Sequence, residues 1–172
     1  MRLSALPITL PILLASALAA GACRPQPPAP PAPAQPSYVP GLGEIMTFNQ
    51  MRHTKLWFAG QAENWPLAAY ELDELREGFD DAARFHPTQK GSPLPIKDLV
   101  PKMVTEPLHQ LDLAIQAKDK ARFDDAFDEL TRACNSCHQA ANFGFNVVRR
   151  PTANPFTNQV FTPAGPSETT GK

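Results

Sequence analysis

The chain has little of what defines several common classes of protein. Its 172 residues carry 16 basic and 17 acidic side chains, so no excess of positive charge favours binding to nucleic acid. Alternation of apolar and polar residues with a strand period is scarce, which argues against a sheet. The apolar run near the N-terminus is short and interrupted by proline, and does not predict a membrane span. Only three cysteines are present.

One C-x-x-C pair is followed directly by a histidine, in the stretch Cys134-Asn135-Ser136-Cys137-His138. This spacing is typical of a c-type haem attachment site. On one helical turn both thiols can bond to the two vinyl groups of a porphyrin, and the adjacent imidazole can bind the iron. A redox-active dithiol and half of a zinc site are the alternatives, but no strand precedes the pair and no second C-x-x-C exists. The motif therefore predicts one covalently bound haem c per chain, with His138 as the proximal iron ligand.

The N-terminus has the features of an export signal. Arg2 precedes an apolar run that continues to Leu14, as in a secretory signal peptide. The small residues before Cys23 resemble a bacterial lipobox, although Ala20 stands where a large aliphatic residue is usual. Since haem attachment accounts for the other two cysteines, we expect residues 1–22 to be a signal peptide and Cys23 to be lipidated at the periplasmic side of a bacterial membrane. The same small residues fit an ordinary cleavage site, so a soluble periplasmic protein is the alternative.

Three further segments follow the signal. Residues 23–42 are rich in Pro and Ala, a composition that cannot bury apolar surface and favours extended polyproline conformations. At about 3 Å per residue this tether could hold a domain roughly 50 Å from its anchor. We expect residues 43–148 to form the haem-binding domain and residues 149–172 to form a tail that packs on it in part. The phenylalanines that suggest such packing are Phe145, Phe156 and Phe161.

Helical periodicity dominates the predicted domain. The expected helices cover about residues 43–60, 64–84, 97–118 and 119–142. Their apolar residues recur every three or four positions, and the stripe of the last one consists of Phe123, Phe127, Leu130, Cys134, Cys137 and Ala141. Asn64 and Asp119 are expected caps, Gly144 is an expected stop, and Pro107 predicts a kink or a division of the third helix. These patterns predict an all-α fold, a four-helix bundle with haem attached near the end of the last helix.

With a C-x-x-C-H motif near the end of the last of four helices, residues 43–142 resemble the cytochrome c-prime family, also called class II c-type cytochromes. The matching residues are Cys134, Cys137 and His138. A weaker match is Arg52, which stands four residues before Leu56, as an Arg precedes the distal-side residue in the family. The resemblance implies a haem-binding bundle whose first helix faces the distal side of the iron, and it allows a homodimer formed through the helices. The interrupted third helix, the tether and the tail depart from the family.

The function depends on the sixth coordination position of the iron, because a filled position suits electron transfer and an open one can bind small molecules. The candidate ligands are His53, Met46, Met51, Met103, His86 and His109. His53 leads, since it lies on the arc of the first helix that we expect to be buried, which comprises Ile45, Met46, Phe48, Arg52, His53, Leu56, Trp57 and Ala59. The alternative for His53 is a core-edge histidine satisfied by a hydrogen bond. The family match instead places Leu56 over an open iron.

Arg52 is a candidate to pair with a haem propionate, and its alternative is an arginine that reaches the surface. Arg149 and Arg150 are weaker candidates for the same role. A peroxidase would need a distal acid-base pair, but the adjacent residues Arg52 and His53 point about 100° apart on a helix.

These features predict a tethered monohaem electron carrier that exchanges electrons with redox partner proteins and is not an enzyme. The alternative is a five-coordinate haem protein that binds small gases such as nitric oxide or carbon monoxide. A dithiol oxidoreductase is the alternative without haem.

Overall fold

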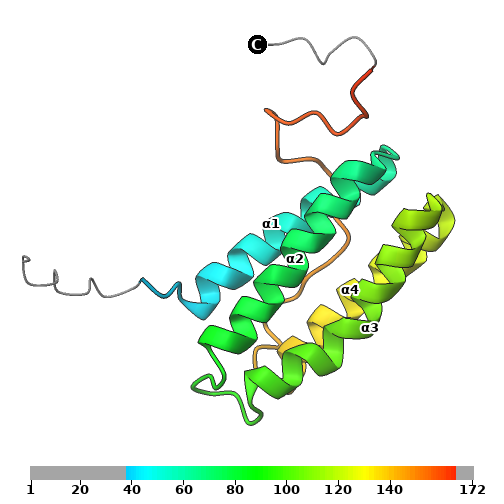
Figure 1. Cartoon of the computed structure of the whole chain (residues 1–172). Helices are drawn as coiled ribbons and strands as arrows, with labels where there is room; N and C mark the ends of the chain where they lie inside the picture. The colour runs from blue at the N-terminus through cyan, green and yellow to red at the C-terminus, as the bar shows by residue number, and fades with distance from the viewer. Residues whose placement is uncertain (1–37, 166–172) are drawn as a thin grey trace, which may run out of the picture. The chain divides into compact units, whose positions relative to one another are not determined.

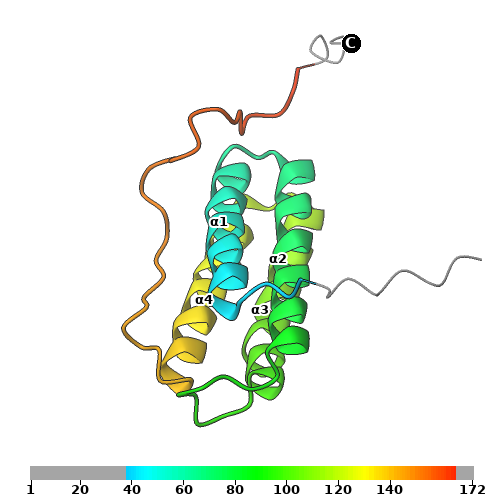
Figure 2. The same cartoon turned by 90° about the vertical axis from the view of Figure 1, so that its left-hand side faces the viewer.

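The computed structural model describes residues 38–165, so the predicted signal peptide, Cys23 and most of the predicted tether lie outside the described residues. Four helices follow one another: α1 (Leu42–Gln61), α2 (Trp65–Phe85), α3 (Ile96–Ala117) and α4 (Lys120–Ala140). They form an all-α four-helix bundle, which confirms the predicted fold class (Figures 1 and 2). Contacts are extensive between helices that follow one another and sparse between α1 and α4. None of the helices in this part of the chain is long and apolar enough to span a membrane.

Two of the helix starts follow the predicted capping chemistry. The Asn64 side chain accepts a 3.3 Å hydrogen bond from the Leu67 amide, and the Asp119 side chain accepts a 3.0 Å bond from the Arg122 amide. Each bond satisfies one of the amide groups that a helix start leaves without a partner. Both residues predicted as caps are therefore confirmed.

The end of α4 differs from the expectation. The helix ends at Ala140, and the residue with left-handed backbone geometry is Asn142, with φ 65°, rather than the predicted stop Gly144. The Phe143 amide bonds to the His138 carbonyl at 2.7 Å, and the Asn142 amide bonds to the Gln139 carbonyl at 3.1 Å. This is the pairing of a Schellman motif, in which Asn can take the position usually held by Gly. The motif turns the chain back toward the last turn of α4.

Pro107 does not divide α3, which runs as one helix through Pro101 and Pro107. The predicted division is wrong. Each proline removes an internal hydrogen bond and disfavours the helix. The buried face opposes this cost through the side chains of Ile96, Leu99, Val100, Val104, Leu108, Leu111, Ala114 and Ile115.

The buried face of α1 also differs in one turn from the expected arc. Phe48 is 52% exposed, whereas the polar residue Asn49 is buried between α1 and α2. A Cβ atom placed on Gly78 of α2 would lie 1.9 Å from the Asn49 Oδ1 atom. The close approach of α1 and α2 at this level therefore needs a glycine on one helix and a small amide on the other.

The chain after α4 runs back along the bundle, beside α4 and α1, toward the connection between α1 and α2 (Figure 2). Phe161 is buried against Phe58, with ring centres 5.7 Å apart, and its carbonyl accepts a 3.0 Å hydrogen bond from the Asn64 side chain. Phe156 packs on the core, but Phe145 is 83% exposed. Two of the three phenylalanines predicted to pack do so.

Candidate functional site

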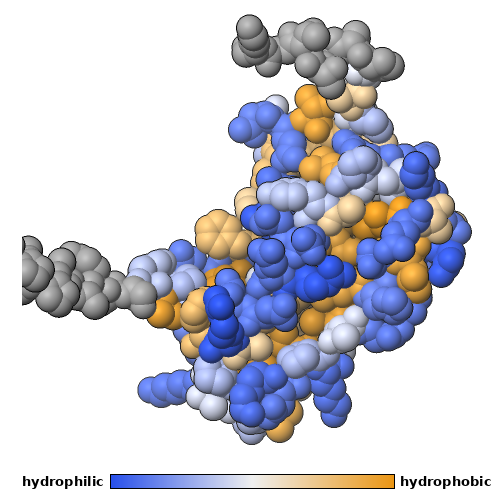
Figure 3. All heavy atoms as spheres, viewed as in Figure 1, coloured by the Kyte–Doolittle hydropathy of each residue, from blue (hydrophilic) through white to orange (hydrophobic). Residues whose placement is uncertain are grey.

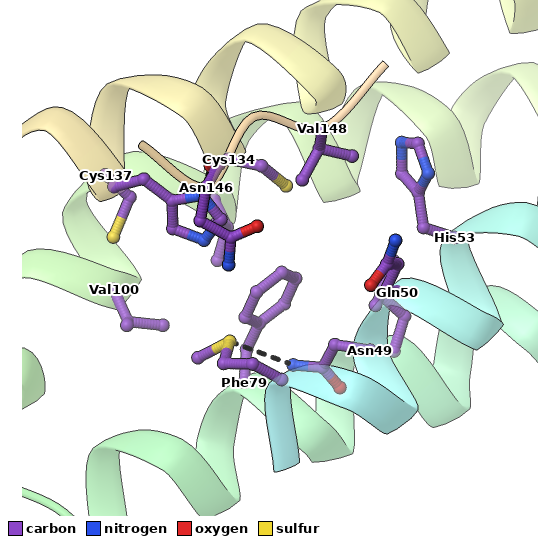
Figure 4. Close-up of a pocket in the computed structure, with 13 residues that line it drawn as sticks. Asn49, Gln50, His53, Phe79, Val100, Cys134, Cys137, Asn146 and Val148 are labelled. Carbon is purple, nitrogen blue, oxygen red and sulfur yellow. Dashed lines mark hydrogen bonds between the residues drawn. The ribbon is translucent and has the colours of Figure 1, made fainter. Parts of the chain in front are cut away.

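A cavity at one end of the bundle receives side chains from all four helices and from the segment after α4 (Figure 4). The space free of protein atoms at this site is about 620 Å³, a volume that includes open solvent at its mouth. The lining residues are Met46, Asn49, Gln50, His53, Leu75, Phe79, Val100, Val104, Cys134, Cys137, His138, Asn146 and Val148. The structure thus brings both motif thiols, His138 and His53 to one cavity.

A second hollow adjoins the first at the C-terminal end of α4. Several residues line both hollows, namely Met46, Val100, Cys137, His138 and Asn146. The two hollows therefore share a wall that includes Cys137 and His138. The two thiols stand on one wall among mainly apolar side chains, so they are the groups to which a haem would bond and these side chains are the ones against which it would pack.

His138 is held by the segment that follows α4. Its Nδ1 atom lies 2.6 Å from the carbonyl oxygen of Asn146. A carbonyl can only accept, so Nδ1 carries the proton and the lone pair of the neutral ring is on Nε2. Histidines that bind metals usually have this second hydrogen bond, which selects the tautomer and orients the ring. His138 is thus prepared to bind a metal through Nε2.

The two thiols do not have the properties of a reactive dithiol. Cys134 and Cys137 are both free, and burial raises the pKa of the Cys134 thiol to about 12, with a further contribution from Cys137. Burial also raises the pKa of Cys137. Redox-active C-x-x-C pairs instead depend on a lowered thiol pKa, often at the N-terminus of a helix. This pair lies near the C-terminal end of α4, where the helix dipole disfavours a thiolate.

A zinc site has no support either. Within residues 38–165, no group of three or more His, Cys, Asp or Glu side chains is close enough together to hold a metal ion. A structural zinc ion needs four such ligands. The pair of thiols and one histidine therefore fit covalent haem attachment better than the two alternatives considered from the sequence.

One face of α1 forms the wall of the cavity opposite the motif, with Met46, Asn49, Gln50 and His53 at helical spacing (Figure 4). Leu56, the residue that the family match places over the iron, is completely buried in the core and is not among the residues that line the cavity. Donor atoms suitable for iron are therefore present on this wall, in the Met46 thioether and the His53 imidazole.

His53 already has a partner. Its Nε2 atom lies 2.9 Å from the hydroxyl of Thr131, and the ring packs on Phe127 with centres 4.4 Å apart. The Thr131 hydroxyl donates to the Phe127 carbonyl at 2.9 Å, so it accepts from His53 and the His53 lone pair is on Nδ1. Burial lowers the pKa of His53 to about 4, which keeps the ring neutral near pH 7.

The other candidate ligands lie elsewhere. His86 bonds to the Pro40 carbonyl at 2.8 Å, and Met51 and Met103 do not line the cavity. His109 lies at a hollow between α2 and α3, where Figure 3 shows hydrophobic residues gathered between hydrophilic ones.

Two of the three arginines considered for a propionate, Arg52 and Arg150, are paired with acids. Arg52 pairs with Glu74 and lies 3.7 Å from Glu71 in the contact between α1 and α2, outside the cavity lining. Arg150 pairs with Asp128 at 2.7 Å and lies over the Trp57 ring. Neither arginine shows a free charge directed to the cavity.

The sequence did not identify Asn49, Thr131, Asn135 and Asn146 as parts of this site. The position of Asn135 inside the motif was the only feature of the sequence that could have indicated its role. No periodic pattern marks Asn146 in the irregular segment after α4. Comparison with known proteins adds no relative, since no family model, curated protein or solved structure matches the chain. The function is therefore inferred from the site itself.

Proposed function

We propose that this chain is an exported monohaem c-type cytochrome that carries electrons between redox partner proteins. Cys134 and Cys137 hold the haem through thioether bonds, and His138 binds the iron through Nε2. When bound, haem supplies an iron centre that gains and loses one electron. The helices of the bundle and the segment after α4 surround the cavity with mainly apolar side chains, which limits access of water.

One observation carries the proposal. Both thiols line one cavity together with His138, and the Nδ1 atom of that histidine is 2.6 Å from the Asn146 carbonyl. The hydrogen bond leaves Nε2 as the metal-binding atom. The raised thiol pKa of Cys134 weighs against a catalytic dithiol at the same position.

The wall on α1 supports an electron carrier over a gas-binding protein. Met46 and His53 offer a thioether and an imidazole on the cavity wall, whereas Leu56 is buried in the core. A methionine or a histidine opposite the proximal ligand is the arrangement of electron-transfer haem proteins. We expect one of these two side chains to fill the sixth position. For His53 this requires binding through Nδ1 or loss of the bond to Thr131.

The location of the protein is part of the proposal. An export signal at residues 1–22, a lipid on Cys23 and a Pro-rich tether would hold the bundle at the periplasmic side of a membrane. A mass spectrum of the mature protein tests this. An unmodified N-terminus at Cys23 would contradict the anchor and leave a soluble periplasmic carrier.

The test of function compares four proteins made in a host that attaches haem c: the wild type, Met46→Leu, His53→Ala and Met51→Leu. We expect the wild type to carry the mass of one covalent haem, and its reduced form to be low-spin and unreactive with carbon monoxide. Either Met46→Leu or His53→Ala should produce a five-coordinate iron that binds carbon monoxide. Met51→Leu is the control, since Met51 is outside the cavity lining and the substitution keeps the size of the side chain.

Two results would contradict the proposal in different ways. A five-coordinate wild type that binds carbon monoxide or nitric oxide avidly would favour the gas-binding alternative. Absence of covalent haem in a protein with a normal circular dichroism spectrum would instead favour a dithiol oxidoreductase.

A further inference from the structure

The side chain of Asn135, between the two cysteines, makes a double hydrogen bond to the backbone of Val148. The Asn135 Nδ2 atom donates to the Val148 carbonyl at 2.8 Å, and the Val148 amide donates to the Asn135 Oδ1 atom, also at 2.8 Å. Asparagine is one of two residue types whose side chain offers both a donor and an acceptor of this kind. This double bond fixes both the position and the direction of the segment at Val148.

Between the end of α4 and Val148, the backbone makes a series of hydrogen bonds over the last turn of α4. The Phe143 amide bonds to the His138 carbonyl at 2.7 Å, and the Asn146 amide bonds to the Phe143 carbonyl at 2.9 Å. The Asn146 carbonyl then accepts from His138 Nδ1 at 2.6 Å. The backbone that accepts from the imidazole therefore lies between two attachments, one to His138 itself and one to Asn135.

Packing contributes little to holding this segment. Phe145 and Val147, the neighbours of Asn146, are 83% and 71% exposed. The next attachments along the chain are those of Arg150, which pairs with Asp128, donates to the Asp124 carbonyl at 3.3 Å and lies over the Trp57 ring. The side chains of the ion pair are 41% and 40% exposed, so the pair itself stabilises only weakly. Asn135 is therefore the nearest restraint on the position of the Asn146 carbonyl from the C-terminal side.

We propose that Asn135 is a positioning residue for the proximal ligand: by binding both polar backbone groups of Val148, it holds the Asn146 carbonyl on His138 Nδ1. The inference rests on the proposed function, because it assigns the carbonyl a role in tuning an iron ligand. An acceptor on Nδ1 makes the imidazole a better electron donor and restricts its rotation. A stronger donor stabilises oxidised iron more than reduced iron, so this contact lowers the reduction potential.

The experiment measures the reduction potential and the His138 Nδ1 proton in the haem-loaded protein. Asn135→Leu removes both hydrogen bonds, and Asn135→Asp removes the donor while keeping the size. Val148→Pro removes the backbone amide that donates to the Asn135 side chain and leaves the haem attachment motif unaltered. Ser136→Ala is the matched control, because Ser136 is an exposed neighbour within the same motif.

We expect Asn135→Leu and Val148→Pro to have a more positive potential than the wild type. In Asn135→Asp the added negative charge favours oxidised iron and opposes this change, so that variant is assessed by the Nδ1 proton alone. A tenfold bias toward the reduced form corresponds to about 59 mV for one electron. The Nδ1 proton resonance should also exchange faster with solvent in these variants. Ser136→Ala should leave both quantities at their wild-type values.

The outcomes separate this inference from the proposed function. If haem is attached but Asn135→Leu and Val148→Pro change only the melting temperature, Asn135 has a purely structural role and the inference is overturned. If Asn135→Leu or Asn135→Asp fails to fold or to attach haem, Val148→Pro alone tests the inference, since it leaves the C-x-x-C-H motif intact. If the wild type itself lacks covalent haem, the proposed function fails and the inference fails with it.

Discussion

His53 and Thr131 connect the first helix with the last through a buried hydrogen bond of 2.9 Å between Nε2 and the hydroxyl. Contacts between α1 and α4 are otherwise sparse. Thr131 stands one helical turn before Cys134, so the bond lies at the edge of the cavity that holds the motif. It therefore orients the His53 ring and, together with the contacts of Trp57 with Phe123 and Phe127, holds α1 to α4.

Thr131→Val should destabilise the protein by about 1–3 kcal/mol, since it leaves a buried Nε2–H group without an acceptor. The measurement is the free energy of unfolding in urea, monitored by circular dichroism. Thr105→Val is the matched control, because Thr105 makes the same kind of bond to its own helix, to the Pro101 carbonyl, but is exposed. Equal losses in the two variants would contradict a stabilising role of the His53 contact.

Acid should weaken the protein through His53. Burial lowers its pKa from 6.5 to about 4, so the unfolded chain binds a proton more readily than the folded one between these values. The stability that depends on a neutral His53 ring is complete above pH 6.5 and is lost as the pH falls toward 4. A tenfold change in proton affinity is worth about 1.4 kcal/mol, which gives a loss of about 3 kcal/mol. His53→Gln keeps a donor for Thr131, and its unfolding free energy should lack this part of the pH dependence.

Local rules predicted most of the fold. The 3.6-residue periodicity placed the four helices, and the side chains of Asn64 and Asp119 act as caps because capping depends only on residues within one turn. The same rules failed where packing decides. Pro107 remains within α3 because the helix buries a long apolar face, and Phe48 is exposed because α2 approaches α1 at Asn49 and Gly78.

The chemistry of the site was readable where it is local. Cys134, Cys137 and His138 share one helical turn, so their spacing alone predicted that they act together. The partner of His53 lies 78 residues away along the chain, and Val148 approaches Asn135 only because the Schellman motif at Asn142 reverses the chain. Periodicity cannot predict such contacts, because they arise when separate segments pack together.

Glu71→Gln should stabilise the protein at neutral pH. The Glu71 side chain is 1% exposed, its Oε2 atom has no hydrogen-bond partner, and Arg52 and Lys55 lie 3.7 Å and 4.0 Å from its oxygens. Burial, together with the nearby Glu74 carboxylate, raises the pKa of Glu71 more than Lys55 and Arg52 lower it. The folded protein therefore favours the neutral form of Glu71. The stability gained by protonating Glu71 is lost as the pH rises through the pKa that it has in the folded state.

Urea unfolding of wild type and Glu71→Gln at several pH values tests this. The gain from the substitution should be largest near pH 7 and should shrink as the pH falls toward the ordinary glutamate value. Glu129→Gln is the control, because Glu129 is exposed. A loss of stability at pH 7 in Glu71→Gln would show that the ion pairs outweigh the cost of burial.

Two glycines of α1 should respond to alanine in opposite directions. A Cβ atom on Gly60 would lie 2.1 Å from the Phe123 ring, whereas nothing lies within 4 Å of one on Gly43. Gly60→Ala should therefore cost about 1–3 kcal/mol by overpacking the core. Gly43→Ala should add about 0.5–1 kcal/mol through the better helix propensity of alanine. Thermal unfolding of both variants tests these two expectations. A stabilising effect of Gly60→Ala would mean that the Phe123 ring moves away at no cost in free energy.

Phe161 should anchor the C-terminal segment to the bundle. It is 8% exposed, packs on Phe58 and accepts a hydrogen bond from Asn64 through its carbonyl. Phe161→Ala leaves a cavity there and should cost about 3–5 kcal/mol if the site cannot collapse. Phe145→Ala is the control and should change stability by less than about 0.5 kcal/mol, since Phe145 is 83% exposed. Amide hydrogen exchange distinguishes local from global loss: release of the segment alone speeds exchange in residues 150–161 but leaves α1–α4 protected. Equal exchange in the two variants would contradict the anchoring role of Phe161.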